Sequence, residues 1–314
     1  MQAALPQALT AALEALLHGV GRKDLAAAAE KLSAGYRTGQ TSAALVTAAD
    51  AIAYAVARSP ATYAACAAVF MRLSEAVPGF APATVLDVGA GTGAASWAAD
   101  AAWPGVRVTM LDRNPALRAL ARRLADAGLA GAEILSGDLA AEKPRADLVV
   151  ASYVLAELAQ DKAADAACDL WPSANIALAL VEPGTPAGFA RIRLARAALI
   201  AAGAHVAAPC THDAPCPMSA DDWCHFSQRL PRARDHMLLK GATVPFEDER
   251  YAYVVVTREK PKRSTARILA PPLEAKPGLT FKLCDETGLG ARFVPARDRN
   301  ETRRMRRKDW GDLF

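Results

Sequence analysis

The sequence contains no long apolar run. No stretch of about eighteen uncharged apolar residues occurs in the 314-residue chain, which excludes a membrane-spanning helix. The N-terminal residues also lack the basic start and apolar core of a signal peptide, and the arginine-rich face of a transit peptide. We therefore expect a cytoplasmic protein that has no membrane partner.

The chain also lacks internal repeats and the composition of a disordered protein. Apolar residues make up 52% of it and charged residues 22%, as in ordinary soluble proteins. Its mass of 33.0 kDa suits one large domain or two smaller ones with a sizeable core. Fibrous and intrinsically disordered proteins are excluded.

Charge is distributed unevenly along the chain. Residues 1–225 hold 17 Lys and Arg against 21 Asp and Glu, whereas residues 226–314 hold 20 against 12. The balance is therefore −4 in the first part and +8 in the second. A basic end on a mildly acidic body is typical of a protein that docks on a polyanion, although a solvated tail gives the same count.

Residues 1–80 carry a helical pattern. Apolar residues fall on one helix face in two sets: Leu5, Leu9, Leu13, Leu16 and Val20, and then Leu45, Ile52 and Val56. Ser59 and Pro60 read as the N-cap and first residue of a helix that runs toward Val77 and ends at Pro78-Gly79. We expect a helical N-terminal region here.

Short apolar strands alternate with helices over residues 81–258, which predicts a parallel sheet with crossover helices. The expected strands are TVLDVGAG, VRVTMLD, AEILSGD, ADLVVASYVL, NIALALVEPG, HVAAPC and YAYVVVT. A loop-rich insertion over about 205–240 interrupts the pattern, and residues 259–314 show short strands and Pro-Gly turns. The predicted fold class is α/β: a Rossmann-like sheet with an N-terminal helical cap and a small, basic, β-rich C-terminal module.

A glycine-rich turn follows the first of these strands. LDVGAGTG places three glycines between a strand and a helix, where glycine permits a tight turn and the close approach of a ligand. The next two strands end in acids, one suited to ribose hydroxyls and one to an adenine amino group. With only one such nucleotide half, the pattern resembles class I S-adenosylmethionine methyltransferases more than dinucleotide dehydrogenases. The predicted cofactor-binding residues are Asp87, Gly89, Gly91, Gly93, Asp112 and Asp138.

The chemistry stays open on the sequence alone. Many amino-group methyltransferases carry an Asn/Asp-Pro-Pro-aromatic turn after the fourth strand, and this chain has ASYVLAEL there. No cysteine pair typical of cytosine C5 methylation lies on these strands. Tyr153 and Glu157 face the pocket in one interpretation and serve helical packing in the other. The sequence therefore names no catalytic residue.

Six cysteines occur, and no CxxC pair is among them. Cys66 and Cys168 lie in helical, alanine-rich segments and are expected in the core. The others form a C-x5-C-x7-C segment with one later thiol: Cys210, Cys216, Cys224 and Cys284. Four thiolates can hold a tetrahedral zinc ion or an iron–sulfur cluster, and the missing CxxC pairs favour iron–sulfur. His212 and His225 are possible substitute ligands, although turn or outer-shell hydrogen bonds explain them as well.

One ordered set of segments resembles a known family: YAVARSPATYAA, LDVGAGTG, LVEPGTPAGF, APCTHDAPCP, DWCHFSQR, FEDERYAYVVV and RRMRRKDWGDLF. The chain is similar over these segments, from about residue 50 to its end, to the methyltransferase-like-seventeen family, which includes the yeast Rsm-twenty-two proteins. The cysteine segment with DWCHFSQR is the most specific part. Members of the family are mitochondrial small-ribosomal-subunit assembly proteins with bacterial relatives. The absence of a transit peptide from this sequence indicates a bacterial-type member.

The resemblance implies an assembly factor that binds small-subunit rRNA, with S-adenosylmethionine and a four-iron four-sulfur cluster as cofactors. It assigns the cluster to Cys210, Cys216, Cys224 and Cys284, and the cofactor turn to the glycine segment. In this light the basic tail is expected to neutralise phosphates and to stack on bases. The predicted RNA-binding residues are Arg303, Arg304, Arg306, Arg307, Lys308 and Trp310, and Lys262, Arg263 and Arg267 are expected to extend their surface.

Three functions remain in competition. The first is a small-subunit assembly factor that methylates rRNA with S-adenosylmethionine. The second is a non-catalytic rRNA-binding assembly protein that uses the cofactor only structurally. The third is a small-molecule methyltransferase with a zinc site, which explains the sheet but not the basic tail. In each case we expect a monomer.

Overall fold

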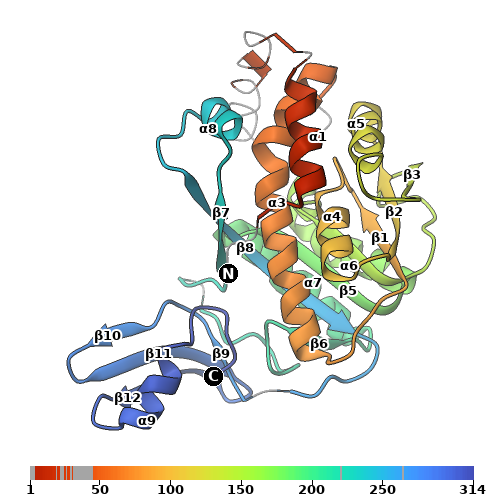
Figure 1. Cartoon of the computed structure of the whole chain (residues 1–314). Coiled ribbons are helices and arrows are strands. Elements are labelled where there is room, and N and C mark those ends of the chain that lie inside the picture. The colour runs from red at the N-terminus through yellow and green to blue at the C-terminus, as the bar shows by residue number, and fades with distance from the viewer. Residues whose placement is uncertain are drawn as a thin grey trace.

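The computed structural model describes residues 4–18, 20–21, 25, 27–28, 30, 45–219, 221–263 and 265–314. Part of the predicted helical region 1–80 therefore lies outside the described residues. Among the described helices, none is both long and apolar enough to cross a membrane. Figure 1 shows the two parts of the molecule, a large sheet with helices packed on it and a smaller sheet beside it.

The large sheet has the strand order β3-β2-β1-β4-β5-β8-β6, and β7 extends it by pairing with β8. The first five strands are parallel, and β8 runs antiparallel between β5 and β6. This order is that of the class I methyltransferase fold, so the predicted fold class is confirmed. The strands are β1 (Thr84–Val88), β2 (Arg107–Asp112), β3 (Glu133–Ser136), β4 (Ala146–Ser152), β5 (Ala174–Pro183), β6 (His205–Ala208), β7 (Phe226–Pro231) and β8 (Phe246–Thr257).

Helices cover both faces of this sheet (Figure 1). The helices of the first face are α1 (Gln7–Leu17), α3 (Ala48–Ala76), α4 (Ala94–Ala102) and α5 (Pro115–Ala125). On the other face lie α6 (Ala163–Leu170) and α7 (Pro186–Ala201), with the short turns η2 (Leu155–Glu157), η3 (Gln160–Lys162) and η4 (Trp171–Ser173). Apolar side chains of α1, α3 and the strands belong to one continuous core.

Helix α3 is longer than the sequence predicts. A capping box starts it, because Thr47 Oγ1 accepts from the Asp50 amide at 3.0 Å and Asp50 Oδ2 accepts from the Thr47 amide at 3.1 Å. Pro60 lies inside the helix, so the helix start predicted at Ser59-Pro60 is wrong. Proline removes one helical hydrogen bond, and the burial of this segment against the sheet compensates for that loss.

The insertion between β6 and β8 contains more regular structure than the sequence predicts. Strand β8 begins at Phe246 rather than at residue 251, and its first half pairs with β7 from Phe226↔Tyr251 to Pro231↔Phe246. Helix α8 (Arg234–Lys240) closes the far end of this ribbon. The charged segment FEDER hid the strand, because both faces of the ribbon carry polar residues and the apolar alternation is weak.

The smaller sheet contains β9 (Arg267–Ile268), β10 (Leu273–Ala275), β11 (Gly278–Asp285) and β12 (Gly288–Pro295), and α9 (Arg299–Met305) packs on it. It has its own apolar core, which includes Phe281, Val294 and Met305. We call residues 265–314 the C-terminal module. The boundaries near residues 80 and 258 stay predictions, since the N-terminal helices share their core with the large sheet.

Candidate functional site

The glycine turn after β1 has a backbone that favours glycine. Gly89, Gly91 and Gly93 have φ angles of +68°, +57° and +84°, in the left-handed region that side chains disfavour. The Gly91 amide donates to Asp112 Oδ2 at 2.7 Å, which joins the turn to the end of β2. The turn is therefore held by the next strand and exposes backbone to the carboxyl edge of the sheet, where ligands bind in open α/β folds.

Asp87 lies fully buried under this turn. Its Oδ2 atom accepts from the Ser96 amide at 3.1 Å and the Ser96 hydroxyl at 2.7 Å. Its Oδ1 atom is buried and has no hydrogen-bond partner among the described residues. Burial raises the pKa of Asp87 to about 7, against the lowering effect of the two Ser96 hydrogen bonds. An unsatisfied buried acceptor at this place suits a cationic or hydrogen-bond-donating ligand group.

The two other predicted acids differ in burial. Asp112 ends β2 and is buried, and its Oδ1 atom accepts from the Asn114 amide at 2.7 Å. Burial raises its pKa, and the oxygens keep lone pairs for ligand hydroxyls. Asp138 is exposed two residues beyond β3, and its Oδ1 atom accepts from the Ala140 and Ala141 amides. The adenine contact of Asp138 stays a prediction.

Helix α3 packs against the glycine turn, and the sequence alone does not predict this contact. Ser59 Oγ and Thr92 Oγ1 form a buried hydrogen bond at 2.6 Å. A Cβ atom placed on Gly91 would lie 3.7 Å from the Tyr54 hydroxyl. Tyr54 and Ser59 belong to the segment YAVARSPATYAA, but the local pattern of this segment indicates only a buried helix face. The docking of α3 brings them to the turn.

The segment after β4 is packed against the same turn. Tyr153 has a φ angle of +60°, and its hydroxyl donates to Glu249 Oε1 at 2.6 Å. Burial raises the pKa of Tyr153 well above its usual range. A Cβ atom placed on Gly89 would lie 2.4 Å from Val154 Cγ2, so valine fills the space in front of the turn. Glu157 forms an ion pair with Arg113 at 3.2 Å.

Glu182 is an acid of this edge that sequence reasoning missed. It lies fully buried near the end of β5, and its Oε1 atom accepts from the Leu155 amide at 2.9 Å. Its Oε2 atom has no hydrogen-bond partner among the described residues. Burial raises the pKa of Glu182 to about 8. The sequence did offer one signal: Glu182 is an acid inside the apolar run LALVEP, and burying a charged side chain there costs free energy unless it has a partner or a function.

The four predicted ligand cysteines lie around one cavity. Cys210 follows β6, Cys224 precedes β7, Cys216 lies in the loop between them and Cys284 is on β11. Cys284 Sγ lies 3.6 Å from His212 Nε2. Burial raises the pKa of Cys210, that of Cys284 to about 12, and that of Cys224 well above its usual range. The fold therefore gathers thiols from segments far apart in the chain.

The thiols surround a cavity rather than a point. Within the described residues, no group of three or more His, Cys, Asp or Glu side chains is placed to hold a metal ion. The predicted iron–sulfur cluster and its zinc alternative therefore both stay predictions. The two remaining cysteines are apart from this cavity: Cys66 is buried in α3 and Cys168 is half-buried on α6.

Arg267 corrects the predicted RNA surface. This arginine is only 2% exposed and lines the cysteine cavity. Its Nε atom donates to the Pro209 carbonyl and its Nη1 atom to the Gly311 carbonyl, each at 2.9 Å. Arg267 also forms an ion pair with Glu75 of α3 at 3.3 Å. It therefore joins the C-terminal module to the large sheet and does not face solvent.

The predicted RNA-binding tail is divided between solvent and interior. Arg303, Arg304, Arg306 and Arg307 are exposed, and two of them form ion pairs, Arg306 with Glu274 at 2.7 Å and Arg304 with Glu301 at 3.9 Å. Lys308 is half-buried.

The Trp310 ring contacts His225 edge-on, with centroids 4.9 Å apart, and lies 6.4 Å from the Phe226 ring. Trp310 thus packs the tail against the cysteine segment. Its predicted role in base stacking, like the roles of the tail cations, stays a prediction.

Comparison with known proteins decides the family. The family model described as mitochondrial small ribosomal subunit Rsm22 matches residues 48–314, which include the glycine turn and all four cavity cysteines. The chain belongs to the Rsm22 family. The resemblance inferred from the sequence is thereby confirmed.

Two curated relatives of this chain are larger proteins. The human ribosome assembly protein METTL17, mitochondrial, is 29% identical in an alignment 288 residues long that covers 84% of this chain and 62% of that protein. The Rsm22-cox11 tandem protein 2, mitochondrial, of Schizosaccharomyces pombe is 29% identical in an alignment 215 residues long that covers 53% of this chain and 29% of that protein. The chain thus spans less than two thirds of the length of these relatives.

Solved structures give more distant similarities. A magnesium protoporphyrin IX methyltransferase from Synechocystis with bound S-adenosylmethionine has a TM-score of 0.41 at 20% identity, over 63% of this chain and 80% of that one. A precorrin-6y C5,15-methyltransferase from Geobacter metallireducens has a TM-score of 0.40 at 16% identity, over 61% of this chain and 86% of that one.

Proposed function

We propose that this Rsm22-family chain is an assembly factor of the small ribosomal subunit that binds S-adenosylmethionine, carries a four-iron four-sulfur cluster and contacts rRNA. One observation carries the proposal: Cys210, Cys216, Cys224 and Cys284 converge on one cavity at the junction with the C-terminal module. A chain whose cysteines only filled space would have no reason to gather four of them there. The names of the relatives support the ribosomal role.

The residues around the cysteine cavity fit a cluster. In a cube of iron and sulfide each thiolate binds a different iron, so the four ligands surround the group and need not meet at a single ion. Thiolates with a cluster carry net negative charge, and the buried guanidinium groups of Arg196 and Arg267 line the same cavity. Cys210, Cys216, Cys224 and Cys284 would hold the cluster, which would join the insertion to β11.

The glycine turn fits S-adenosylmethionine. Asp87 offers an unsatisfied buried oxygen, and Asp112 offers lone pairs beside the Gly91 amide. When bound, this cofactor supplies an electrophilic methyl group. The chain would orient it through Asp87 and Asp112 and exclude water through Val154.

The non-catalytic version of this function is supported by a specific observation. Methyl transfer to a nitrogen or oxygen needs groups that position the acceptor and remove its proton. Tyr153 is bound to Glu249 and Glu157 is paired with Arg113, so both candidate groups are engaged. We therefore favour an assembly factor that uses the bound cofactor structurally. The small-molecule methyltransferase remains the third candidate.

The first experiment is metal and sulfide analysis of anaerobically purified protein, together with its visible absorption spectrum. We expect about four irons and four sulfides per chain with a broad visible band. Stoichiometric zinc without a visible band would contradict the cluster and leave an ordinary methyltransferase as the better function. Calorimetric titration with S-adenosylmethionine on the same sample tests the turn independently.

The catalytic question has its own assay. Small subunits isolated from a strain that lacks the chain are incubated with the protein and radiolabelled S-adenosylmethionine. In the version we favour, no label enters the rRNA, and a cofactor-binding variant such as Asp87→Ala impairs assembly. Label in rRNA that the same variant abolishes, with assembly unaffected, would establish the enzyme instead. Cytoplasmic location and a monomeric state complete the proposal.

A further inference from the structure

His212 is a buried histidine that the proposed function does not use. It lies in the loop between Cys210 and Cys216 and is only 3% exposed. Its Nε2 atom lies 3.6 Å from the Sγ atom of Cys284, a distance that suits a hydrogen bond to sulfur. The loop follows β6, whereas Cys284 is on β11 of the C-terminal module. The histidine ring therefore joins two segments that lie 72 residues apart in the chain.

The backbone around His212 is held by two neighbouring elements. Arg196, a buried residue of α7, donates from Nη2 to the His212 carbonyl at 2.8 Å and to the Ala214 carbonyl at 2.9 Å. Between these two residues, Asp213 Oδ1 accepts from the Val206 amide of β6 at 2.8 Å. A ring whose backbone is fixed in this way can hold a metal ligand in place from outside the coordination sphere.

The direction of the hydrogen bond follows from the state of the sulfur. A cysteine that binds iron is a thiolate, which has no proton and can only accept a hydrogen bond. His212 must then carry a proton on Nε2 and donate it toward Cys284 Sγ. This holds for the neutral Nε2–H tautomer and for the imidazolium alike.

A donor at this place lowers the cost of an iron ligand. Cys284 is only 9% exposed, and burial raises its pKa to about 12. Iron binding nevertheless requires the sulfur to lose its proton. A hydrogen bond from His212 stabilises the charged sulfur and fixes the direction of the cysteine side chain.

We propose that His212 is a positioning residue of the cysteine cavity, which donates from Nε2 to Cys284 Sγ and holds this thiolate for the cluster. The inference rests on the proposed four-iron four-sulfur cluster and adds an outer contact to its four cysteines. Direct iron binding by His212 is the alternative. In a cube whose four irons each bind one cysteine, no iron has a place left for a histidine.

The test uses the full chain, purified anaerobically with its iron. His212→Phe keeps a ring but removes the donor, and His212→Gln places an amide N–H near the position of Nε2. We expect His212→Phe to lose iron to a chelator about 10- to 100-fold faster than the wild type, whereas His212→Gln stays near the wild-type rate. The midpoint potential should fall in His212→Phe and recover in His212→Gln, because a hydrogen bond to sulfur stabilises the reduced cluster.

His205→Phe is the matched control. His205 is half-buried on β6 and contacts the same loop, since its Nδ1 atom lies 3.2 Å from Asp213 Oδ2. Its replacement disturbs the loop but leaves the contact with Cys284 in place. The rate of iron loss and the midpoint potential should stay as in the wild type. Circular dichroism melts of all three variants check that the chain is folded.

A spectroscopic measurement tests the contact itself. The chain is prepared with histidine labelled with a nitrogen isotope, the cluster is reduced with dithionite, and pulsed electron paramagnetic resonance records nuclei close to the cluster. We expect a weak coupling to labelled nitrogen that His212→Phe abolishes and His205→Phe keeps. A strong coupling, typical of a histidine bound to iron, would overturn the outer contact and make His212 a ligand.

The outcomes separate this inference from the proposed function. If the wild type holds the cluster and a folded His212→Phe keeps its potential and its rate of iron loss, the role of His212 is wrong and the cluster stands. If His212→Gln behaves like His212→Phe, the ring acts by packing, which also overturns the hydrogen bond. If the wild type holds no iron and sulfide, the cluster and this inference both fail. Should His212→Phe not fold, His212→Gln and the labelled wild type still decide.

Discussion

The glycine turn and the cysteine cavity are built in opposite ways. The turn takes its parts from neighbouring residues, and its conformation is encoded in glycines whose φ angles are positive. The cavity takes its thiols from Cys210 to Cys284, and these meet only when β11 of the C-terminal module docks on the large sheet. The turn can therefore form with its strand, whereas the cavity depends on the assembled chain. Changes at the cavity should have distant effects, and changes at the turn local ones.

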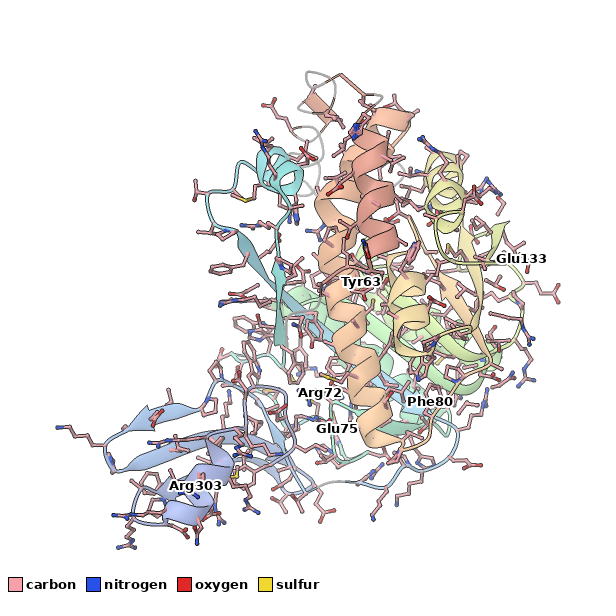
Figure 2. All side chains as sticks on the ribbon, in the orientation of Figure 1. Tyr63, Arg72, Glu75, Phe80, Glu133 and Arg303 are labelled. Atoms are coloured by element: carbon pink, nitrogen blue, oxygen red, sulfur yellow. The ribbon has the colours of Figure 1, made fainter. Side chains whose placement is uncertain are left out.

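Helix α3 joins the two regions. Near its middle, Ser59 bonds to Thr92 beside the glycine turn. At its end, Arg72 forms an ion pair with Asp312 at 2.7 Å and Glu75 pairs with Arg267 in the cavity wall. Figure 2 shows Arg72 and Glu75 on the end of α3 nearest the C-terminal module. The comparison is thus testable at both ends of one helix.

The largest effect is expected from Cys284→Ser. Iron and sulfide should fall to background, because β11 supplies only this thiol to the cavity. Since ligand binding at such a site is coupled to folding, hydrogen exchange should rise throughout the C-terminal module. Cys168→Ser, in a half-buried thiol on α6, is the matched control and should change neither quantity. Full cluster content in Cys284→Ser would contradict the ligand assignment.

A second, smaller effect is expected at the turn. Asp87→Ala should weaken S-adenosylmethionine binding about 10- to 100-fold, the cost of one hydrogen bond to a charged group. Calorimetric titration measures it. Asp138→Ala removes an exposed acid that closes a local turn and should cost much less. Iron content should stay normal in both variants. If Asp87→Ala lost the cluster, the expectation that changes at the glycine turn have only local effects would be contradicted.

The same contrast explains what the sequence could predict. The glycine turn and Asp112 could be predicted because they lie at the ends of two consecutive strands, so their order and separation in the sequence already indicate that they are neighbours in the site. Ser59 was misread as a helix cap, because its partner Thr92 belongs to another element. Arg267 was placed with the surface arginines because its sequence neighbourhood is equally basic, and only the fold buries it. The parallel sheet with crossover helices was predicted from the alternation of strands and helices, whereas the β7–β8 ribbon lacks an apolar alternation.

A third prediction concerns pH. The pKa values of Asp87 and Glu182 are raised to about 7 and about 8, from 3.8 and 4.5 for free side chains. The unfolded chain therefore loses these protons first, and stability that is fully present below about pH 4 declines as the pH rises toward 8. Glu182→Gln removes one charge that burial disfavours and should raise the Tm at pH 8.5 by about 3 °C or more, with little change at pH 4.

The control for this pH effect is Glu133→Gln. Glu133 points into solvent at the edge of the sheet in Figure 2. Its replacement should leave the pH dependence of the Tm as in the wild type. A Glu182→Gln variant with the same Tm shift at both pH values would mean that packing, not charge, sets the effect.

The smallest effect sharpens the role of α3. Ser59→Ala removes the buried hydrogen bond to Thr92 and leaves the threonine hydroxyl unsatisfied, which costs about 1–3 kcal/mol. If this bond holds the turn in its binding conformation, cofactor affinity should fall about 3- to 10-fold while iron content is unchanged. The double variant Ser59→Ala with Thr92→Val removes both polar partners, so stability should recover much of the loss. Affinity that recovers with it would mean that α3 positions the turn by packing, whereas affinity that stays low would assign the positioning to this hydrogen bond.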